Sequence, residues 1–440
     1  MSQVDWLGQQ VGAPYIRRYR WVGLAAPCMV TFAFCGMVLV YLIGGPAFYT
    51  KVARSVVIEA WDYPFLDSAG LMSWLECTRR GVNVHIANPC DVLGRTNSYS
   101  PLWHQLAWTG LGPDNVMSVG VVTALGFLTA LFLLPAARRW RDAILLGLAF
   151  LSPPVLFGIE RGNPDLTIFC LAVVAAGISL QAGWKRGFAY GLVLLAGLLK
   201  QYPLVLFLLA VRESLARLVA VGVIAILLTA GYVALEAPNL IEAWQRIPTT
   251  EWVGTYLGAP MLQMGLTTLL PRRVALVPVT LIMQCGLVVA AMLLLWRTNL
   301  RQRVMALPSL EGVLLLAGAA LMVGCFLAGM SIMYRAIFLL MVLPALLRFA
   351  GDSRSEATSR LLRVAPWLVL VLLWAWLVPL PVSGELYGPG WLAVYVMWQF
   401  AWWALMALLL AALFAQIWDS RAIRDFRGRL GWISGSYPVN

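Results

Sequence analysis

The chain has 440 residues, of which 61% are hydrophobic and only 12% are charged, and its mean hydropathy is +0.80. Soluble globular proteins contain about 45–50% apolar and about 25% charged residues. This composition excludes a soluble protein and predicts an all-α polytopic membrane protein, with residues 1–440 forming one integral membrane domain. The net charge of +12 is typical of basic loops beside a membrane and does not indicate nucleic-acid binding.

The first apolar run, residues 21–43, predicts a helix that anchors the chain in the membrane. It is longer than the apolar region of a cleaved signal peptide, which has about 7–15 residues, and no clear small-residue cleavage site follows it. Arg17, Arg18 and Arg20 precede the run. We therefore expect a signal-anchor helix that remains on the protein.

Further apolar runs predict about 12 transmembrane helices, within a range of about 10–13, because about 20 apolar residues are needed to cross the bilayer core. The runs are 22–43, 116–136, 143–159, 166–182, 187–200, 203–211, 215–235, 274–296, 307–328, 336–348, 364–381 and 391–417. Three of them, 187–200, 203–211 and 336–348, are short for independent spans. They could be tilted, broken at a proline or re-entrant.

The distribution of basic residues predicts the orientation. If the helices alternate in direction, 21 of the 32 Lys and Arg residues fall on one side of the membrane and 11 on the other. The positive-inside rule makes the first side cytoplasmic, together with both termini. The extracytoplasmic side then carries a long first loop, 44–115, and the shorter connections 160–165, 200–202, 236–273, 331–335 and 383–390.

The first loop contains the acids Asp62, Asp67, Glu76 and Asp91 together with several bases and aromatic residues. Residues 68–78 have the apolar spacing of a short amphipathic helix at the membrane interface. A positioned, partly desolvated carboxylate beside such a helix can act as a general base on a substrate hydroxyl. Solvated charges are equally expected in a loop of this length, so each acid also has a purely structural interpretation.

Cys77 and Cys90 both lie in this loop, whereas the other five cysteines fall in predicted spans. A disulfide between them would close a short loop that contains His85, as is usual on an oxidising side. A zinc site formed by Cys77, Cys90 and His85 is the weaker interpretation because the sequence lacks a C-x-x-C spacing.

The connection ERGNPD, residues 160–165, joins two predicted spans with mostly polar residues. Asn163-Pro164-Asp165 is typical of a helix N-terminus. Glu160 and Arg161 have no such explanation. Arg161 could bind a phosphate through two parallel hydrogen bonds, or it could form a salt bridge with Glu160.

Two further connections each place a base beside a tyrosine, Lys200 with Tyr202 and Arg335 with Tyr334. Snorkelling of the side chain to the surface would explain a base at a helix end. However, the positive-inside bias disfavours cations on this side without a function. The recurrence of Arg161, Lys200 and Arg335 at three outer turns therefore favours a site for a lipid phosphate or pyrophosphate.

Several short motifs on this side resemble the glycosyltransferase family 87 group of the GT-C superfamily, whose members use polyprenyl-phosphate sugars. GLVLLAGLLKQYPLVLFLLAVRE resembles the family stretch that contains G-x-x-x-G-x-x-K-x-x-P, and ERGNPDLTIFCL is similar to the ERGN-N-DL-type motif of uncharacterised bacterial relatives. MYRAIFLLMVLPALL, NPCDVLGR and SYSPLW resemble three more of their elements. These matches extend from about residue 60 to residue 350.

The resemblance implies a GT-C-like fold and an inverting transfer of a sugar from a polyprenyl-phosphate donor to a lipid or glycan acceptor, on the extracytoplasmic side of a bacterial inner membrane. The catalytic base in such enzymes is an acid of the first outer loop, which corresponds best to Asp67, with Asp91 second. Cations would stabilise the leaving phosphate. The binding residues implied are Arg161, Asn163, Lys200, Tyr202, Tyr334, Arg335, Arg95 and Glu160.

The sequence departs from the family at two motifs. Pro164 replaces the usual second Asn of ERGNND, and Ser100-Pro101 replaces Pro-Arg, so Arg95 would have to take the role of that arginine. No D-x-D pair is present, so no cofactor or metal is required, although a divalent cation could assist. The alternatives are a transporter or flippase of lipid-linked sugars without transferase chemistry, and a non-catalytic scaffold.

Overall fold

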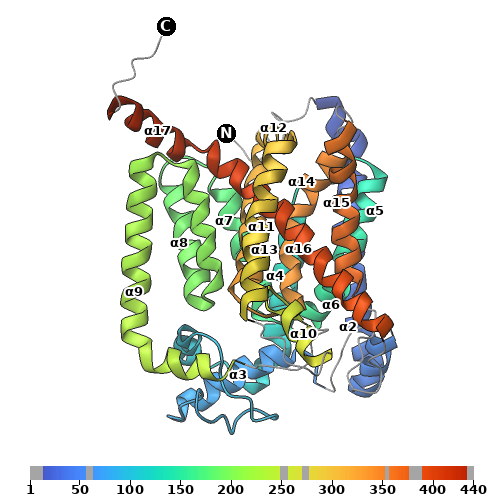
Figure 1. Cartoon of the computed structure of the whole chain (residues 1–440). Helices are drawn as coiled ribbons and strands as arrows, with labels where there is room; N and C mark the ends of the chain where they lie inside the picture. Colours follow the sequence, from blue (N-terminus) through green and yellow to red (C-terminus); the bar gives the residue numbers. More distant parts are fainter. Residues whose placement is uncertain are drawn as a thin grey trace.

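The computed structural model of the chain describes residues 13–55, 63–247, 256–269, 277–351, 356–375 and 389–433. These residues form an α-helical protein with many long apolar helices (Figure 1). Among them, the only β-structure is one antiparallel pair, β1 (Tyr256–Leu257) with β2 (Ser331–Ile332). The class predicted from composition, an all-α polytopic membrane protein, is confirmed.

The helices follow one another along the chain with short connections, and several are 3-10 helices, labelled η. In order they are α2 (Ala13–Ser55), α3 (Leu66–Arg79), η1 (Pro101–Thr109), η2 (Pro113–Asn115), α4 (Val116–Phe132), α5 (Trp140–Phe150), α6 (Pro153–Arg161), α7 (Pro164–Ile178), α8 (Trp184–Leu199), η3 (Tyr202–Arg212), α9 (Leu215–Gln245), α10 (Met261–Leu269), α11 (Val277–Arg297), α12 (Leu300–Met305), α13 (Ser309–Ala328), η5 (Met333–Phe338), α14 (Leu339–Gly351), α15 (Glu356–Trp374), α16 (Pro389–Trp418) and α17 (Arg421–Ile433).

Seven of the described helices are long and apolar enough to cross a membrane, or eight if α5 and α6 form one span bent by 47°. This is fewer than the predicted 12, because several apolar runs form short helices. α7 has 15 residues and η3 has 11. A 3-10 helix rises about 2.0 Å per residue, so η3 extends about 22 Å, less than the bilayer core of about 30 Å.

Prolines and capping residues explain where the helices break. Ser152 precedes Pro153 and Pro154, which suit the first turn of a helix but cannot continue α5. Asn163 caps α7, its side chain accepting a hydrogen bond from the backbone N–H of Asp165. These breaks place polar turns at the helix ends, where the candidate site lies.

The buried centre of the bundle consists of α13 and α14. In the most apolar window of each, 78% and 83% of the residues are buried, compared with 6% for α9 and 11% for α11. Large apolar side chains of α9 such as Leu227 and Leu235 are exposed. An exposed apolar surface of this extent indicates contact with lipid, so α9, α11 and α2 form the periphery of the bundle.

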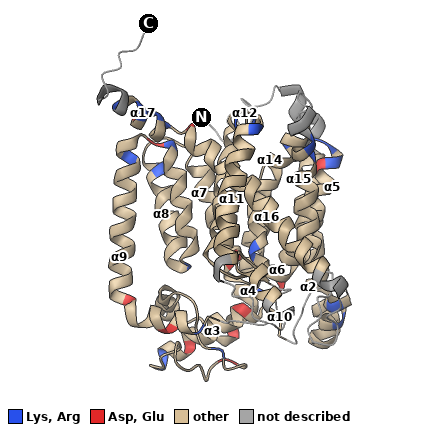
Figure 2. Ribbon diagram, in the orientation of Figure 1, with Lys and Arg blue, Asp and Glu red and all other residues tan. Residues whose placement is uncertain are grey.

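The charged connections gather at two ends of the bundle (Figure 2). At one end, here called the basic end, ion pairs join connections that are far apart in the sequence: Arg301–Asp419, Arg348–Glu311 and Arg186–Glu213. The other end, here called the loop end, carries α3 and η1 (Figure 1). Figure 2 shows many Lys and Arg residues along the basic end and most of the Asp and Glu residues at the loop end.

The structure adds detail to two expectations about the first loop. The loop was predicted to begin at residue 44, but α2 passes through a kink at Gly45 and continues as helix to Ser55. The helix predicted at 68–78 is present as α3. Nine of its residues, including Leu71, Trp74 and Cys77, are buried, because η1, η2 and α4 pack around it. Asp62 lies outside the described residues.

Candidate functional site

The first turn of α3 is attached to the turn that follows α6. The backbone N–H of Phe65 donates to the carbonyl of Glu160 at 2.9 Å, and the Ser68 hydroxyl donates to the carbonyl of Gly162 at 2.8 Å. Phe65 and Gly162 both adopt the left-handed conformation, with φ of 57° and 56°. Two segments about 95 residues apart in the sequence therefore form one rigid turn pair, and Asp67 projects from it.

Gly162 is required at this contact, since a Cβ atom there would lie 2.4 Å from the Ser68 hydroxyl. We expect Gly162→Ala to lower the free energy of unfolding by at least about 2 kcal/mol, through the left-handed backbone and the clash together. Gly177→Ala is the matched control, because nothing lies within 4 Å of its Cβ position. Thermal unfolding in detergent measures both. Equal melting temperatures for the two variants would contradict the assigned role.

The Asp67 carboxylate accepts hydrogen bonds from two residues of the ERGNPD turn. Arg161 donates to Oδ1 from Nη2 at 2.7 Å and from Nε at 3.1 Å, and Asn163 donates to Oδ2 at 2.6 Å. Arg95 lies next to this group, with Nη1 3.9 Å from Oδ1. The Asp67 side chain is 12% exposed. The sequence therefore positions one acid among three donors and leaves it partly accessible.

The salt bridge considered between Arg161 and Glu160 does not form, because Arg161 pairs with Asp67. Glu160 is 4% exposed, and both of its carboxylate oxygens lack a hydrogen-bond partner among the described residues. Burying such a group as an anion is costly. Glu160 therefore differs from Asp67, the acid near it in space, whose carboxylate is hydrogen-bonded.

Asp91 lies behind Arg95. Arg95 donates to Asp91 Oδ2 from Nε at 2.9 Å and to Oδ1 from Nη2 at 2.8 Å, while the backbone N–H groups of Leu93 and Arg95 also donate to Oδ2. Burial alone would raise the pKa of Asp91, but the hydrogen bonds from Arg95 outweigh it and lower the pKa below its ordinary value. Asp91 is therefore an anion that orients Arg95, and its carboxylate is enclosed.

A second cluster surrounds Asp165, at the first turn of α7. Asp165 Oδ1 accepts from Lys200 Nζ at 2.6 Å and from the Tyr202 hydroxyl at 2.9 Å, and Oδ2 lies 3.4 Å from Arg335 Nε. The side chains of Asp165 and Lys200 are 1% and 5% exposed. Lys200 is thus neither at the surface nor free. It is one half of a buried ion pair.

Aromatic rings complete the surroundings of the two bases. Lys200 Nζ lies 4.3 Å from the centre of the Tyr99 ring, and the Arg335 guanidinium lies 4.6 Å from the centre of the Tyr202 ring. Such cation–π contacts are attractive when the cation is desolvated. Arg335 also donates to the Ser331 hydroxyl at 2.6 Å and remains 24% exposed. Of the two bases, Arg335 is the one that still faces an accessible space.

Tyr334 joins the two clusters. Its ring lies 6.2 Å from the ring of Phe157, in the helix that ends at Arg161, while the next residue along the chain, Arg335, reaches Asp165. The structure therefore brings Asp67, Arg95, Arg161, Asn163, Lys200, Tyr202, Tyr334 and Arg335 to the loop end as one polar assembly.

Asp165 also belongs to this assembly, at the centre of its second cluster, but the sequence predicted for it only a place at a helix N-terminus. A signal for it was present in the sequence, since buried cations require an acid partner. Three cations were expected on the loop side, and Asp165 is an acid in one of the same turns.

Cys77 and Cys90 are joined by a disulfide, with their Cα atoms 5.8 Å apart. Both sulfurs are therefore unavailable as zinc ligands, and no group of three potential metal-binding side chains occurs within the residues that the structure describes. His85 instead donates from Nδ1 to the carbonyl of Asn97, at 2.9 Å. The bridge fixes the loop behind α3 and takes no part in the polar assembly.

The only two histidines of the chain lie together in this loop, with ring centres 4.9 Å apart. Asn97 contacts both rings, since its side-chain nitrogen lies 2.6 Å from His104 Nε2. Burial and, to a smaller extent, the neighbouring His85 together lower the pKa of His104 to about 4. Burial also lowers the pKa of His85, although Asn97 and two acids of α9, Glu236 and Glu242, act in the opposite direction.

Acid should therefore destabilise this loop. The folded pKa of His104 lies below the unfolded value of about 6.5, so the unfolded chain binds the proton more readily, and stability is lost as the pH falls from about 6.5 to about 4. We expect His104 to contribute a loss of up to about 3 kcal/mol over this range. Melting temperatures between these pH values should fall less steeply in His104→Gln than in the unaltered protein. Parallel curves would contradict the prediction.

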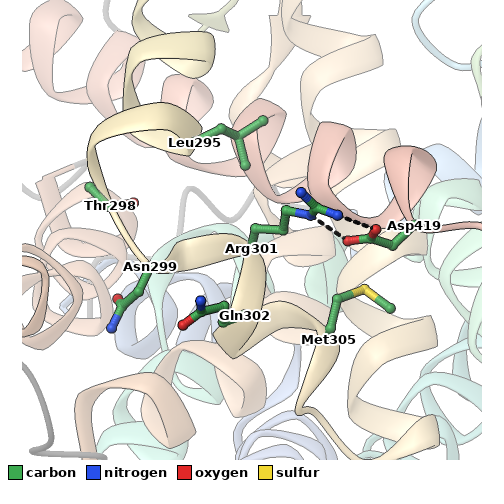
Figure 3. Close-up of a pocket in the computed structure, with 7 residues that line it drawn as sticks. All are labelled: Leu295, Thr298, Asn299, Arg301, Gln302, Met305 and Asp419. Atoms are coloured by element: carbon green, nitrogen blue, oxygen red, sulfur yellow. Dashed lines mark hydrogen bonds and ion pairs between the residues drawn. The ribbon is translucent and has the colours of Figure 1, made fainter. Parts of the chain in front are cut away.

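A cavity of about 500 Å³ lies beside α12 at the basic end, opposite the end that carries α3 in Figure 1, and Figure 3 shows the residues that line it. Its lining comes from the end of α11, from α12 and from the end of α16. The charged lining residues, Arg301 and Asp419, are paired with each other by two hydrogen bonds. A closed ion pair offers no reactive group, so the acid–base assembly at the loop end is the stronger candidate site.

No protein-family model, no curated protein and no solved structure matches the chain.

Proposed function

We propose that this chain is a membrane glycosyltransferase that moves a sugar from a polyprenyl-phosphate donor to a lipid or glycan acceptor. The observation that carries the proposal is the Asp67 carboxylate, which is partly exposed and lies between Arg161 and Arg95 at the end of a membrane helix bundle. An acid beside several cations suits a reaction in which a hydroxyl loses a proton while a phosphate leaves.

In the proposed reaction, the acceptor hydroxyl oxygen attacks the anomeric carbon of the sugar. Its proton passes to Asp67, and the bond between the anomeric carbon and the phosphate oxygen breaks, with the electron pair leaving on the polyprenyl phosphate. Attack from the side opposite the leaving group inverts the configuration at that carbon. The reaction needs no oxidant, cofactor or metal.

The roles of the cations follow from their exposure. Arg335 and Arg95, which are 24% and 29% exposed, are the proposed ligands of the leaving phosphate. Arg161 holds Asp67 in position. Lys200 is enclosed with Asp165, so its proposed role is to stabilise that acid and thereby orient Arg335. Tyr202 and Tyr334 fix the two clusters relative to each other.

The finer arrangement in the membrane is part of the same proposal. α7, α8 and η3 pack on one another, α7 and η3 also pack on the central helix α13, and α15 packs on α14 and α16. We include these four helices among the membrane-embedded ones, which with the eight above gives a GT-C-like bundle of about 12 spans. The basic end faces the cytoplasm together with both termini, and the loop end is extracytoplasmic, in a bacterial inner membrane.

A screen of donors tests the proposal. Membranes that contain the chain are incubated with a panel of radiolabelled polyprenyl-phosphate sugars, and the products are separated as glycolipids or glycans. We expect a labelled product with at least one donor, and none with membranes that lack the chain. Failure of every donor in membranes that supply native acceptor lipids would contradict transfer.

The second candidate is a flippase of lipid-linked sugars. The buried group of Asp165, Lys200 and Arg335 favours it, because ionisable residues inside membrane proteins often mark a transport path. Movement of a fluorescent lipid-linked sugar across liposomes that contain the purified protein, without any glycosyl product, would favour this function over transfer.

A further inference from the structure

The helix α17, at the basic end, is strongly amphipathic. Its sequence RAIRDFRGRLGWI places Arg421, Arg424 and Arg427 on one face at helical spacing, while Ala422, Ile423 and Phe426 lie on the other. Helices with a basic face and an apolar face commonly lie in the plane of a membrane surface.

The apolar face of α17 is seated on the bundle at Ala422 and Ile423, whereas Phe426 is 45% exposed. Ala422 is fully buried, and α17 packs on α9 and η3. The backbone N–H of Leu215, at the start of α9, donates to the Asp425 carboxylate at 3.2 Å, so the one acid of α17 faces inward. These contacts fix the rotation of α17 about its axis and direct the arginine face away from the bundle.

The arginines of α17 form no ion pair of their own within the part of the chain that the structure describes. Arg421, Arg424, Arg427 and Arg429 are all exposed. Arg424 donates to the carbonyl of Asp419, and Arg427 lies 3.9 Å above the Trp418 ring. The Asp419 carboxylate is paired with Arg301, whose hydrogen bonds lower its pKa, and the charges of Arg424 and Arg427 lower this pKa further. One acid that is already paired leaves the arginine face with a net positive charge.

The position of α17 brings this face to the depth of lipid headgroups. Figure 1 shows α17 crossing the ends of α8 and α9, and α9 is the helix with the least buried span, at 6%. Lipid surrounds α9, so the start of α9 marks where the apolar core meets the headgroups. The basic residues of α17, which are blue in Figure 2, therefore lie at this boundary.

We infer that α17 is an interfacial helix whose arginine face binds the headgroups of anionic phospholipids. Basic side chains and an anionic leaflet attract each other over about one Debye length, roughly 8–10 Å in physiological salt. Lipids match the open row of charges better than a folded protein partner would, because the surrounding surface of α9 is itself covered by lipid. The inference does not depend on the proposed transferase activity.

Hydrogen–deuterium exchange of the full-length protein in nanodiscs tests the inference. One set of nanodiscs contains phosphatidylcholine alone, and the other contains about 30% phosphatidylglycerol as the anionic probe. We expect the backbone of residues 421–433 to exchange about tenfold more slowly in the anionic discs at low salt, and this difference to disappear at about 0.5 M NaCl.

Variants separate charge from folding. Arg421→Gln, Arg424→Gln and Arg427→Gln together should abolish the difference between lipids, whereas the same three positions changed to Lys should retain it. Lys185→Gln, at an exposed position of the same end, is the control and should change nothing. Equal exchange in both lipids, or a lipid effect that persists in the Gln variant, would overturn the inference.

Discussion

Replacing Asp67 with asparagine should reduce sugar transfer by at least about 100-fold and by up to about 10,000-fold, the range expected when a general base is removed. Asparagine keeps the size of the side chain, and its single oxygen can still accept from Arg161, although its NH2 group takes the place of the oxygen that accepts from Asn163. It cannot take a proton from the acceptor. The loss should therefore appear mainly in the turnover rate, with the donor KM little changed.

The control for this experiment is Asp114→Asn, an exposed acid at the same end of the protein. Its transfer rate should equal that of the unaltered chain. If Asp67→Asn keeps more than half of the rate while Asp114→Asn is also active, Asp67 is not the base. A large rise in KM at constant turnover would instead assign Asp67 to substrate binding.

Replacing Asp165 with asparagine should lower the free energy of unfolding by about 3–5 kcal/mol, because it leaves buried charges uncompensated. Lys200 would lose its only ion-pair partner among the described residues, and Arg335 would lose its contact at 3.4 Å. Changing Lys200 to methionine in the same chain removes the stranded ammonium. The double variant should therefore be more stable than Asp165→Asn alone.

Denaturant or thermal unfolding in detergent, applied to both single variants and the double variant, gives the coupling energy between the two residues. Arg301→Gln is the comparison, because the Arg301 side chain is 51% exposed in its pair with Asp419 and surface pairs contribute about 1 kcal/mol or less. Additive effects of Asp165→Asn and Lys200→Met would show that the buried pair is not the source of the stability.

The sequence already contained the local rules of this fold. Hydropathy identified the membrane class, and Asn163 with Pro164 located the start of α7. The break before Pro153 was not predicted, because residues 143–159 form one apolar run in the sequence. The two cysteines of the first loop also indicated their pairing. These features depend on residues that are close in the chain, or on composition, and so they can be read without a structure.

Other features depended on packing between distant segments. The length of α2 beyond Gly45 and the burial of α3 were missed, because neither follows from the period of apolar residues. Helix packing decided which surfaces of these segments meet a neighbour and which meet lipid. The segment of η3 is likewise only an apolar run in the sequence. In the structure it forms a 3-10 helix that packs against α8 and α13.

The polar assembly shows most clearly what the sequence by itself determined and what only the tertiary structure decided. The sequence determined that an acid, three cations and two tyrosines lie in connections between apolar helices. Only the tertiary structure decided that Arg161 pairs with Asp67 and not with the adjacent Glu160, and that Asp165 neutralises Lys200. The physical reason is that an ion pair forms where helix packing brings charges within about 4 Å, irrespective of their separation along the chain.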